Sequence, residues 1–144
     1  MMWWCDDVLM CLLLVGWDNL SSMLKENQIL DLSFEFAIMV VGYCEVLEEK
    51  RRFVISHQLL KSGTSIGANI REAQSAESKT DFIHKMKLSS KEAEETEYWL
   101  LLCKHSKSYP SPDILLEKII VIKKILSKII SSAKSSNKLN SSTH

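Results

Sequence analysis

The stretch Ser65–Ser78, with the sequence SIGANIREAQSAES, marks where one long helix ends and another begins. Ile66 and Ile70 lie four residues apart, which places both side chains on one helical face. Ser78 is a favourable N-cap residue, and Asp81, three residues later, is a weaker capping-box partner. The stretch therefore predicts a helix over about 53–76, a short turn, and a helix from Ser78 to about Lys107.

Apolar residues on both sides of this stretch extend the pattern to four helices. A first helix is predicted over about 29–49. A last helix starts near Pro112, where Ser111 and Asp113 supply an N-cap and an early acid. The inward-facing residues are predicted, helix by helix, to be Ile29, Leu32, Phe36, Met39, Tyr43 and Val46; Ile55, Leu59, Ile66, Ile70 and Ala73; Phe82, Met86, Ser89, Ala93, Thr96, Leu100 and Cys103; and Leu115, Ile119, Ile122, Leu126, Ile129 and Ala133. No segment has the pattern of a strand, so the expected fold is all-α, an antiparallel up-and-down four-helix bundle.

The composition is that of an ordinary globular domain. The chain has 144 residues, of which 46% are hydrophobic and 25% charged, and its formal net charge is zero. All 18 Lys and Arg residues fall from Lys25 onward, whereas Asp6, Asp7 and Asp18 precede it. This balance excludes a strongly basic nucleic-acid-binding protein and leaves a mildly basic domain after an acidic start.

The first 22 residues differ from the rest of the sequence. The apolar run from Val8 to Trp17 is shorter than the roughly 20 residues that a membrane span needs. A secretory signal requires Lys or Arg before its apolar run, and none precedes this one. We expect translation to start naturally at Met23, and the alternative is a membrane-surface or partner-binding anchor. The expected organisation is an extension at 1–22, a bundle at 23–132 and a disordered Ser/Lys-rich tail at 133–144.

The four cysteines show no metal-binding spacing. Cys5, Cys11, Cys44 and Cys103 form no CxxC motif and do not pair with His at zinc spacing. Cys44 and Cys103 fall within helical apolar patterns, where a free thiol acts as a small hydrophobic group. Reduced cysteines favour a cytoplasmic protein.

A polar stripe accompanies the apolar face of the helix predicted over 53–76. Its members are Gln58, Ser62, Ser65, Asn69 and Glu72. The stripe either contacts a ligand or RNA, or forms a hydrogen-bonded seam against the next helix, and the seam is favoured because buried polar groups usually find partners within the protein. The expected partners are Lys87, Lys91, Glu94, Glu95 and Thr96. Gly63 and Gly67 each cost a helix about 1 kcal/mol relative to Ala, so we expect another backbone to approach closely there.

The sequence contains no recognisable catalytic or metal-binding motif. The four glutamates between Glu92 and Glu97 lack the Glu-x-x-His motif of di-iron bundles, so they are predicted to be solvated or to pair with Lys and Arg of neighbouring helices. No GxSxG, P-loop or GxGxxG motif occurs. We therefore expect no catalytic residue, metal, cofactor or small-molecule substrate. A hydrolase that uses the polar stripe is the weakest of three functional alternatives.

Three pieces of the sequence resemble a known family. They are SIGANIREA at 65–73, SKTDF at 78–82 and EETEYWL at 94–100. From Met23 to about Ser132, the chain resembles the four-helix-bundle proteins encoded in intervening sequences of bacterial 23S ribosomal RNA genes. These proteins are similar to the accessory protein of diversity-generating retroelements, which assembles as a ring of five and contacts a reverse transcriptase and nucleic acid. The resemblance thus implies a bundle that forms a homo-oligomer of five chains.

The resemblance also assigns the positions of the family motif. These are Ser65, Asn69, Glu72, Glu95 and Thr96, whose side chains suit hydrogen bonding and charge pairing within or between subunits. Many members have Gly directly after the glutamate, where this chain has Ala73, so the helix is expected to run slightly longer here.

Two groups of basic residues are candidates for nucleic-acid binding. Lys50, Arg51 and Arg52 follow the first helix, and Lys123, Lys124 and Lys128 lie in the last one. A symmetric oligomer would repeat such modest patches into a larger basic surface. The expected function is therefore a non-enzymatic oligomeric bundle that binds the RNA or DNA backbone. The alternative is a protein-interaction scaffold without affinity for nucleic acid.

Overall fold

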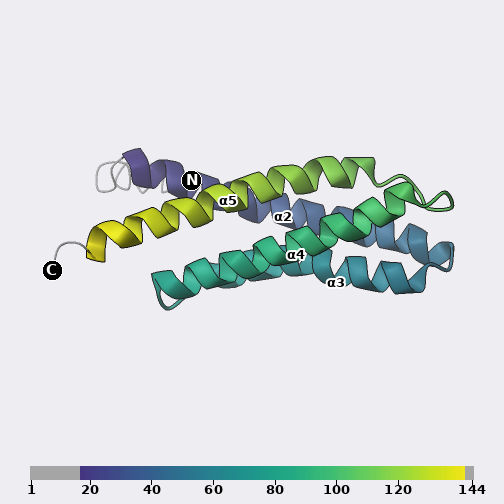
Figure 1. Ribbon diagram of the computed structural model, residues 1–144, viewed down its shortest axis with the longest axis horizontal. Helices are drawn as coiled ribbons and strands as arrows, with labels where there is room; N and C mark the ends of the chain where they lie inside the picture. The colour runs from purple at the N-terminus through teal and green to yellow at the C-terminus, as the bar shows by residue number, and fades with distance from the viewer. Residues whose placement is uncertain (1–16, 142–144) are drawn as a thin grey trace, which may run out of the picture.

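The computed structural model describes residues 17–141, which form four long helices. These are α2 (Trp17–Glu49), α3 (Phe53–Ala73), α4 (Lys79–His105) and α5 (Asp113–Ser141). The helices lie side by side with alternating direction, and each packs against two neighbours in the order α2, α3, α4, α5 and back to α2 (Figure 1). The expected all-α antiparallel four-helix bundle is confirmed.

The core follows the predicted apolar stripes closely in three of the four helices. Buried residues of α3, α4 and α5 include Leu59, Ile66, Ile70, Met86, Ala93, Leu100, Ile119, Ile122 and Leu126. Small shifts occur at three positions. Ser56 and Ile83 are buried where Ile55 and Phe82 were expected, and Ile55, Phe82 and Ala133 are half-buried. Burial of these stripes supplies the main driving force for folding, because it removes apolar surface from water.

The predicted stripe of α2 is wrong by one residue along most of its length. The structure fully buries Ser33, Val40 and Leu47, whereas Val46 remains 38% exposed. Leu32, Met39 and Tyr43 are only partly buried against the core. Spacings of three and four residues both fit a helical face, so the sequence of α2 alone is compatible with the predicted set of inward residues and with the observed set. Contact with α3 selects the observed one, because Val40 packs directly on Gly63.

The connection between α3 and α4 is well defined by its hydrogen bonds. The Ser78 hydroxyl accepts from the Asp81 N–H at 3.1 Å, which confirms the N-cap of α4. Helix α3 ends at Ala73, so the expectation that it extends to about residue 76 is wrong. The Gln74 N–H donates to the Arg71 carbonyl at 3.2 Å, an i→i+3 bond that tightens the final turn.

The two outer helices are longer than the sequence pattern indicates. Helix α2 begins at Trp17 instead of near residue 29, and α5 continues to Ser141 instead of ending near residue 132. Serine hydroxyls are satisfied within α5: Ser135 donates to the Ser131 carbonyl at 3.0 Å and Ser136 to the Ala133 carbonyl at 3.2 Å. These bonds let a polar sequence remain helical through residues expected to be disordered. The expectations for residues 1–16, including Cys5 and Cys11, and for residues 142–144 lie outside the described part of the chain.

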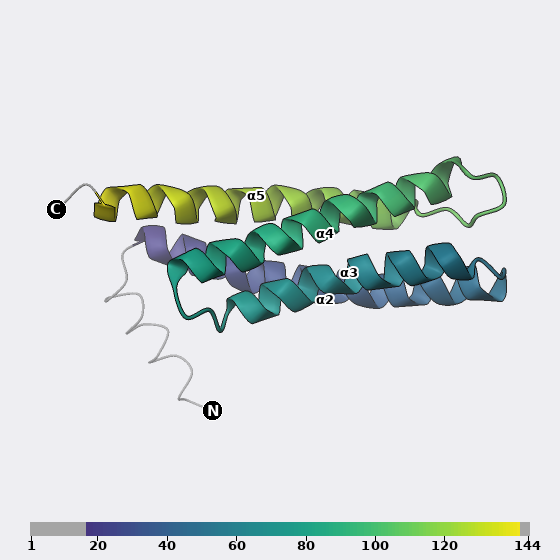
Figure 2. The ribbon, with the colours of Figure 1, turned by 60° about the horizontal axis from the view of Figure 1, so that its bottom comes forward.

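Helix α2 ends in a Schellman motif that a non-glycine residue closes. The Arg52 N–H donates to the Leu47 carbonyl and the Arg51 N–H to the Glu48 carbonyl, both at 2.8 Å. Arg51 occupies the left-handed position with φ of 58°, where glycine is usual. The loop between α4 and α5 lies at the same end of the bundle (Figure 2). There the Tyr43 hydroxyl donates to the Pro110 carbonyl at 2.7 Å and ties this loop to α2.

Candidate functional site

A buried polar seam runs between α3 and α4. The Thr96 hydroxyl lies 2.7 Å from the Glu92 carbonyl and 3.0 Å from the Ser62 hydroxyl. Each hydroxyl has one hydrogen, so Thr96 donates to the carbonyl and accepts from Ser62. The Ser89 hydroxyl donates to the Ile66 carbonyl at 2.9 Å. Because Ser62, Ser89 and Thr96 are fully buried, these groups are used in holding the two helices together.

The remaining motif residues do not join this seam. Ser65 donates to the Lys61 carbonyl at 2.7 Å and the Asn69 amide to the Ser65 carbonyl at 2.8 Å, so both bond within α3. Glu72 does reach α4, where it pairs with Lys85 at 2.7 Å. Neither of the expected lysine partners, at positions 87 and 91, makes this contact. The predicted stripe therefore divides into a buried seam at Ser62 and a half-exposed line along the outside of α3.

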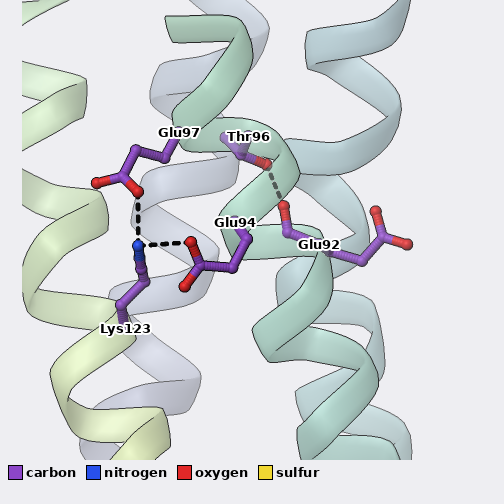
Figure 3. Close-up of polar contacts among 5 residues, drawn as sticks. All are labelled: Glu92, Glu94, Thr96, Glu97 and Lys123. Atoms are coloured by element: carbon purple, nitrogen blue, oxygen red, sulfur yellow. Dashed lines mark hydrogen bonds and ion pairs between the residues drawn. The ribbon is translucent and has the colours of Figure 1, made fainter. Parts of the chain in front are cut away.

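The glutamates of α4 separate into two groups. Glu94 and Glu97 both point toward Lys123 of α5, at 2.8 and 2.5 Å (Figure 3). Burial alone would lower the pKa of Lys123, but the hydrogen bonds that its ammonium donates to the two carboxylates outweigh it and raise that pKa. The predicted pairing with basic residues of a neighbouring helix is confirmed here. Within residues 17–141, no three His, Cys, Asp or Glu side chains gather as they would around a metal ion.

The other two glutamates do not contact Lys123. The Glu92 side chain points away from the Lys123 cluster (Figure 3), and burial and the nearby Glu95 raise its pKa. Glu95, a motif residue, is exposed and accepts from the Trp99 indole N–H at 3.3 Å. Neither carboxylate has the geometry of a catalytic pair, because no nucleophile or base of the described chain hydrogen-bonds to it.

The structure ties the first predicted basic group to the loop before α5. The Arg52 guanidinium donates to the Ser108 hydroxyl at 2.9 Å and lies 5.2 Å from the centre of the Tyr109 ring. Its Nε is buried and has no hydrogen-bond partner in the described chain. Arg52 is half-buried, and its side chain joins the loop after α2 to the loop before α5.

We call the surface formed by residues 50–53 and 104–109 the loop end. Arg52 brings Lys50 and Arg51 to the same end as Lys104, His105 and Lys107, which sequence reasoning missed because the two segments are far apart in the chain. In the described chain, only Lys104 of these basic residues has a carboxylate within 4.0 Å, Asp113 at 3.0 Å. The hydrogen bond from Ser111 and the ammonium of Lys104 lower the pKa of Asp113. The exposed Lys50, Arg51 and Lys107 remain available to an anionic partner.

The second predicted basic group lies apart from the first. Lys123 is held by its two glutamates, whereas Lys124 and Lys128 are exposed on α5. Helix α5 starts beside the loop end and runs away from it, and Lys128 lies roughly 20 Å along its axis at 1.5 Å per residue. The structure therefore does not bring the two groups together within one chain.

Two surfaces expose apolar side chains along the bundle. A groove between α2 and α3 is lined by Leu30, Ser33, Phe34, Ala37, Thr64, Gly67, Ala68 and Arg71. Phe34 at its edge and Ile38 beside it are each 57% exposed. On the α4–α5 side, Leu101 lies one turn beyond Glu97, and Ile120 lies one turn before Lys123. These two side chains are 42% and 44% exposed.

The glycines of α3 contact α2 of the same chain. A Cβ on Gly63 would lie 2.9 Å from the side chain of Val40, and one on Gly67 would lie 3.4 Å from the Ser33 hydroxyl. At Gly63 the neighbour is therefore a side chain and not the expected backbone. The backbone of α2 comes near at Gly67, where the added Cβ would lie 3.5 Å from the Ser33 carbonyl oxygen.

The described cysteines are packing groups. Cys44 and Cys103 are free thiols and almost completely buried. Burial raises the pKa of Cys44 to about 11, and it also raises the pKa of Cys103. Such thiols are poor nucleophiles at neutral pH.

None of the helices between residues 17 and 141 has both the length and the apolar character needed to cross a bilayer.

Comparisons with known proteins identify relatives of the whole bundle. A family described as 23S rRNA-intervening sequence protein matches residues 25–128. The crystal structure of a protein of unknown function from the S23 ribosomal protein family of Bacteroides thetaiotaomicron VPI-5482 is similar, with 43% sequence identity and a TM-score of 0.71. This similarity covers 74% of the present chain and 98% of that one. No curated protein matches the chain. The resemblance carried by residues 65–100 is confirmed over well more than half of the sequence, and the chain belongs to the 23S rRNA-intervening sequence protein family.

Proposed function

We propose that this protein is a non-enzymatic, cytoplasmic homo-oligomer that binds the backbone of RNA or DNA. The observation that carries the proposal is the loop end, where Lys50, Arg51 and Lys107 have no carboxylate partner in the described chain. Cations without internal partners are free to neutralise phosphates, and this contact needs no base-reading motif. Lys124 and Lys128 offer a second, smaller group of exposed cations on α5.

The hydroxyls and thiols of the bundle favour binding over catalysis. Ser62 and Thr96 are buried and hydrogen-bonded to each other, so neither is open to a substrate. Cys44 has a raised pKa and no access to solvent. A nucleophile needs an adjacent base and room for a substrate, and these groups have neither.

Two different apolar surfaces on one chain support self-assembly. The α2–α3 groove, with Phe34 at its edge, and the α4–α5 surface at Leu101 and Ile120 lie on opposite sides of the bundle. When one surface of a chain packs on a different surface of the next chain, the contact is heterologous and can close into a ring. The expected number of five chains rests on the resemblance to the retroelement accessory protein.

The assembly is tested by light scattering over a range of protein concentrations. We expect a multimer of five chains, and a concentration-independent monomer would contradict the proposal. Phe34→Asp should dissociate the multimer, because a carboxylate cannot be buried cheaply in an apolar contact. Phe53→Asp is a matched control, since the two rings are 57% and 58% exposed but Phe53 lies at the loop end, outside the groove.

Nucleic-acid binding is tested by fluorescence anisotropy with RNA and DNA oligomers of several sequences. Because the contacts are expected to be mainly with phosphates, the affinity should depend weakly on sequence and fall steeply as salt is raised. No binding at low salt by the assembled protein would instead favour a protein-interaction scaffold.

A further inference from the structure

We infer that the loop end binds unpaired nucleic acid, with Phe53 stacking on a base while Lys50 and Arg51 contact the neighbouring phosphates. This inference rests on the proposed function and specifies its site and its class of ligand. Phe53 is the first residue of α3 and is 58% exposed, so its ring is open to a ligand beside the basic loop. Aromatic rings beside cations are typical of surfaces that bind single strands.

The loop that carries these residues is held in one conformation. Arg52 lies between Arg51 and Phe53 and is anchored by Ser108 and Tyr109 of the second loop. The Schellman hydrogen bonds fix the backbone on the other side of Arg51. Side chains in the first turn of a helix lean toward its N-terminus, so Phe53 leans toward the basic loop. A fixed backbone lowers the entropy cost of binding.

An unpaired strand fits this arrangement better than a duplex does. Bases within a duplex are stacked on both faces, so a side chain at the surface cannot reach a base plane without disrupting the pairs. In a single strand, the base can turn toward Phe53 while its phosphates lie near Lys50 and Arg51.

The second basic group lacks an aromatic partner. Helix α5, which carries Lys124 and Lys128, contains no Phe, Tyr or Trp along residues 113–141. Stacking is therefore not expected on α5, whose pair of exposed lysines serves as a control for phosphate contact without a ring.

The neighbouring acids favour a strand over an anionic membrane. Glu48 and Glu49 are exposed directly before Lys50. A flat lipid surface that contacts Phe53 would also bring these carboxylates against anionic headgroups, where like charges repel. A strand one nucleotide wide can follow Lys50, Arg51 and Phe53 and leave both glutamates in solvent.

The experiment uses the full chain and fluorescein-labelled oligonucleotides of about 12 nucleotides, unpaired or in duplex. Phe53→Ala should weaken binding of the unpaired strand by about tenfold and that of the duplex by less than about twofold. Phe53→Tyr should preserve the affinity, because it keeps an aromatic ring. Exchanging Lys50 and Arg51 together for Gln should lower the salt slope by about 1.4, the value for two phosphates of a single strand. Exchanging Lys124 and Lys128 together for Gln should weaken binding of the unpaired strand and of the duplex by the same factor, because these lysines contact phosphates without a neighbouring ring.

Each contrary result has a distinct meaning. Unchanged binding by Phe53→Ala, equal affinity for the duplex, or a loss confined to the unpaired strand in the Lys124 and Lys128 exchange would overturn the inference and leave the proposed function standing. No binding of any oligonucleotide at low salt would overturn both. In that case, vesicles of phosphatidylcholine and phosphatidylserine serve as the second probe, and binding that Phe53→Ala abolishes would assign the loop end to membranes. Circular dichroism of every variant verifies that the bundle is intact.

Discussion

The two ends of the bundle use their polar residues in opposite ways. At the turn between α3 and α4, Ser78 caps α4, Glu72 pairs with Lys85, and Lys79 contacts Ser136. At the loop end, α3 begins without a side-chain cap and Arg51 is held at positive φ. The first end follows ordinary folding rules, whereas the second departs from them and leaves Lys50, Arg51 and Lys107 without a carboxylate partner in the described chain. Such departures are expected where a surface is used for binding.

Alkaline pH should weaken the core beneath the loop end more than any single substitution described below. Burial raises the pKa of Cys44 from about 9 to about 11, so the folded state favours the neutral thiol. The stabilisation by the neutral Cys44 thiol is fully present below the pKa of that thiol in the unfolded chain. It is lost as pH rises from about 9 to 11, which lowers the free energy of unfolding by an amount on the order of 2 kcal/mol. Thermal melts across this range should show the loss. Cys44→Ala should make the slope smaller without abolishing it, because burial also raises the pKa values of Cys103 and Tyr43. The same slope in the variant would contradict this assignment.

Removing the side chain that joins the two loops should be the most costly surface change. Arg52→Ala deletes the bond to Ser108 and the cation–π contact with Tyr109, which together contribute about 1–2 kcal/mol. Urea denaturation measures the loss. Lys50→Ala, at an exposed position without an ion pair in the described chain, is the control and should change the unfolding free energy by less than about 0.5 kcal/mol. Equal midpoints for the two variants would show that Arg52 does not join the loops.

At the opposite end, Ser78→Ala should destabilise the bundle by about 1 kcal/mol. The change leaves the Asp81 N–H without its acceptor at the start of α4. Ser75→Ala, in the same turn and without a side-chain bond in the described chain, should be close to neutral in the same urea titration. If the Ser75 variant loses as much unfolding free energy as the Ser78 variant, the loss belongs to the turn as a whole and not to the N-cap bond.

The smallest predicted effect has the opposite sign. Arg51→Gly should stabilise the protein by about 0.5–1 kcal/mol, because glycine adopts positive φ without steric cost. Lys50→Gly is the control and should destabilise, since φ at Lys50 is not positive. If Arg51→Gly lowers the unfolding midpoint in urea, the left-handed position is not strained.

The sequence predicted those features that depend on one helix or one turn. The core line of α4, including Met86 and Leu100, and the Ser78 cap both follow from local spacing. The buried face of α2 could not be predicted from local spacing, because its apolar residues fit two neighbouring faces. The contact of Val40 with Gly63 of α3 selects between the two. The role of Arg52 was also hidden, because its partners at 108 and 109 lie more than 50 residues away in sequence.

The candidate site was predicted in part for the same reason. Lys50 and Arg51 were identified as a basic group, but a linear pattern could not place Lys107 beside them or show that Phe53 is exposed. The residues of the polar stripe were recognised, yet the choice of Ser62 rather than Ser65 for the buried seam depends on how α3 is rotated against α4.

Sedimentation velocity with a labelled unpaired RNA tests the central claim most directly, because it reports assembly and binding together. At about 50 mM salt, we expect the RNA to sediment with an oligomer of the protein, and at about 200 mM salt to sediment largely alone as counterions compete for the phosphates. RNA that sediments alone at the lower salt, beside an intact protein oligomer, would contradict the account.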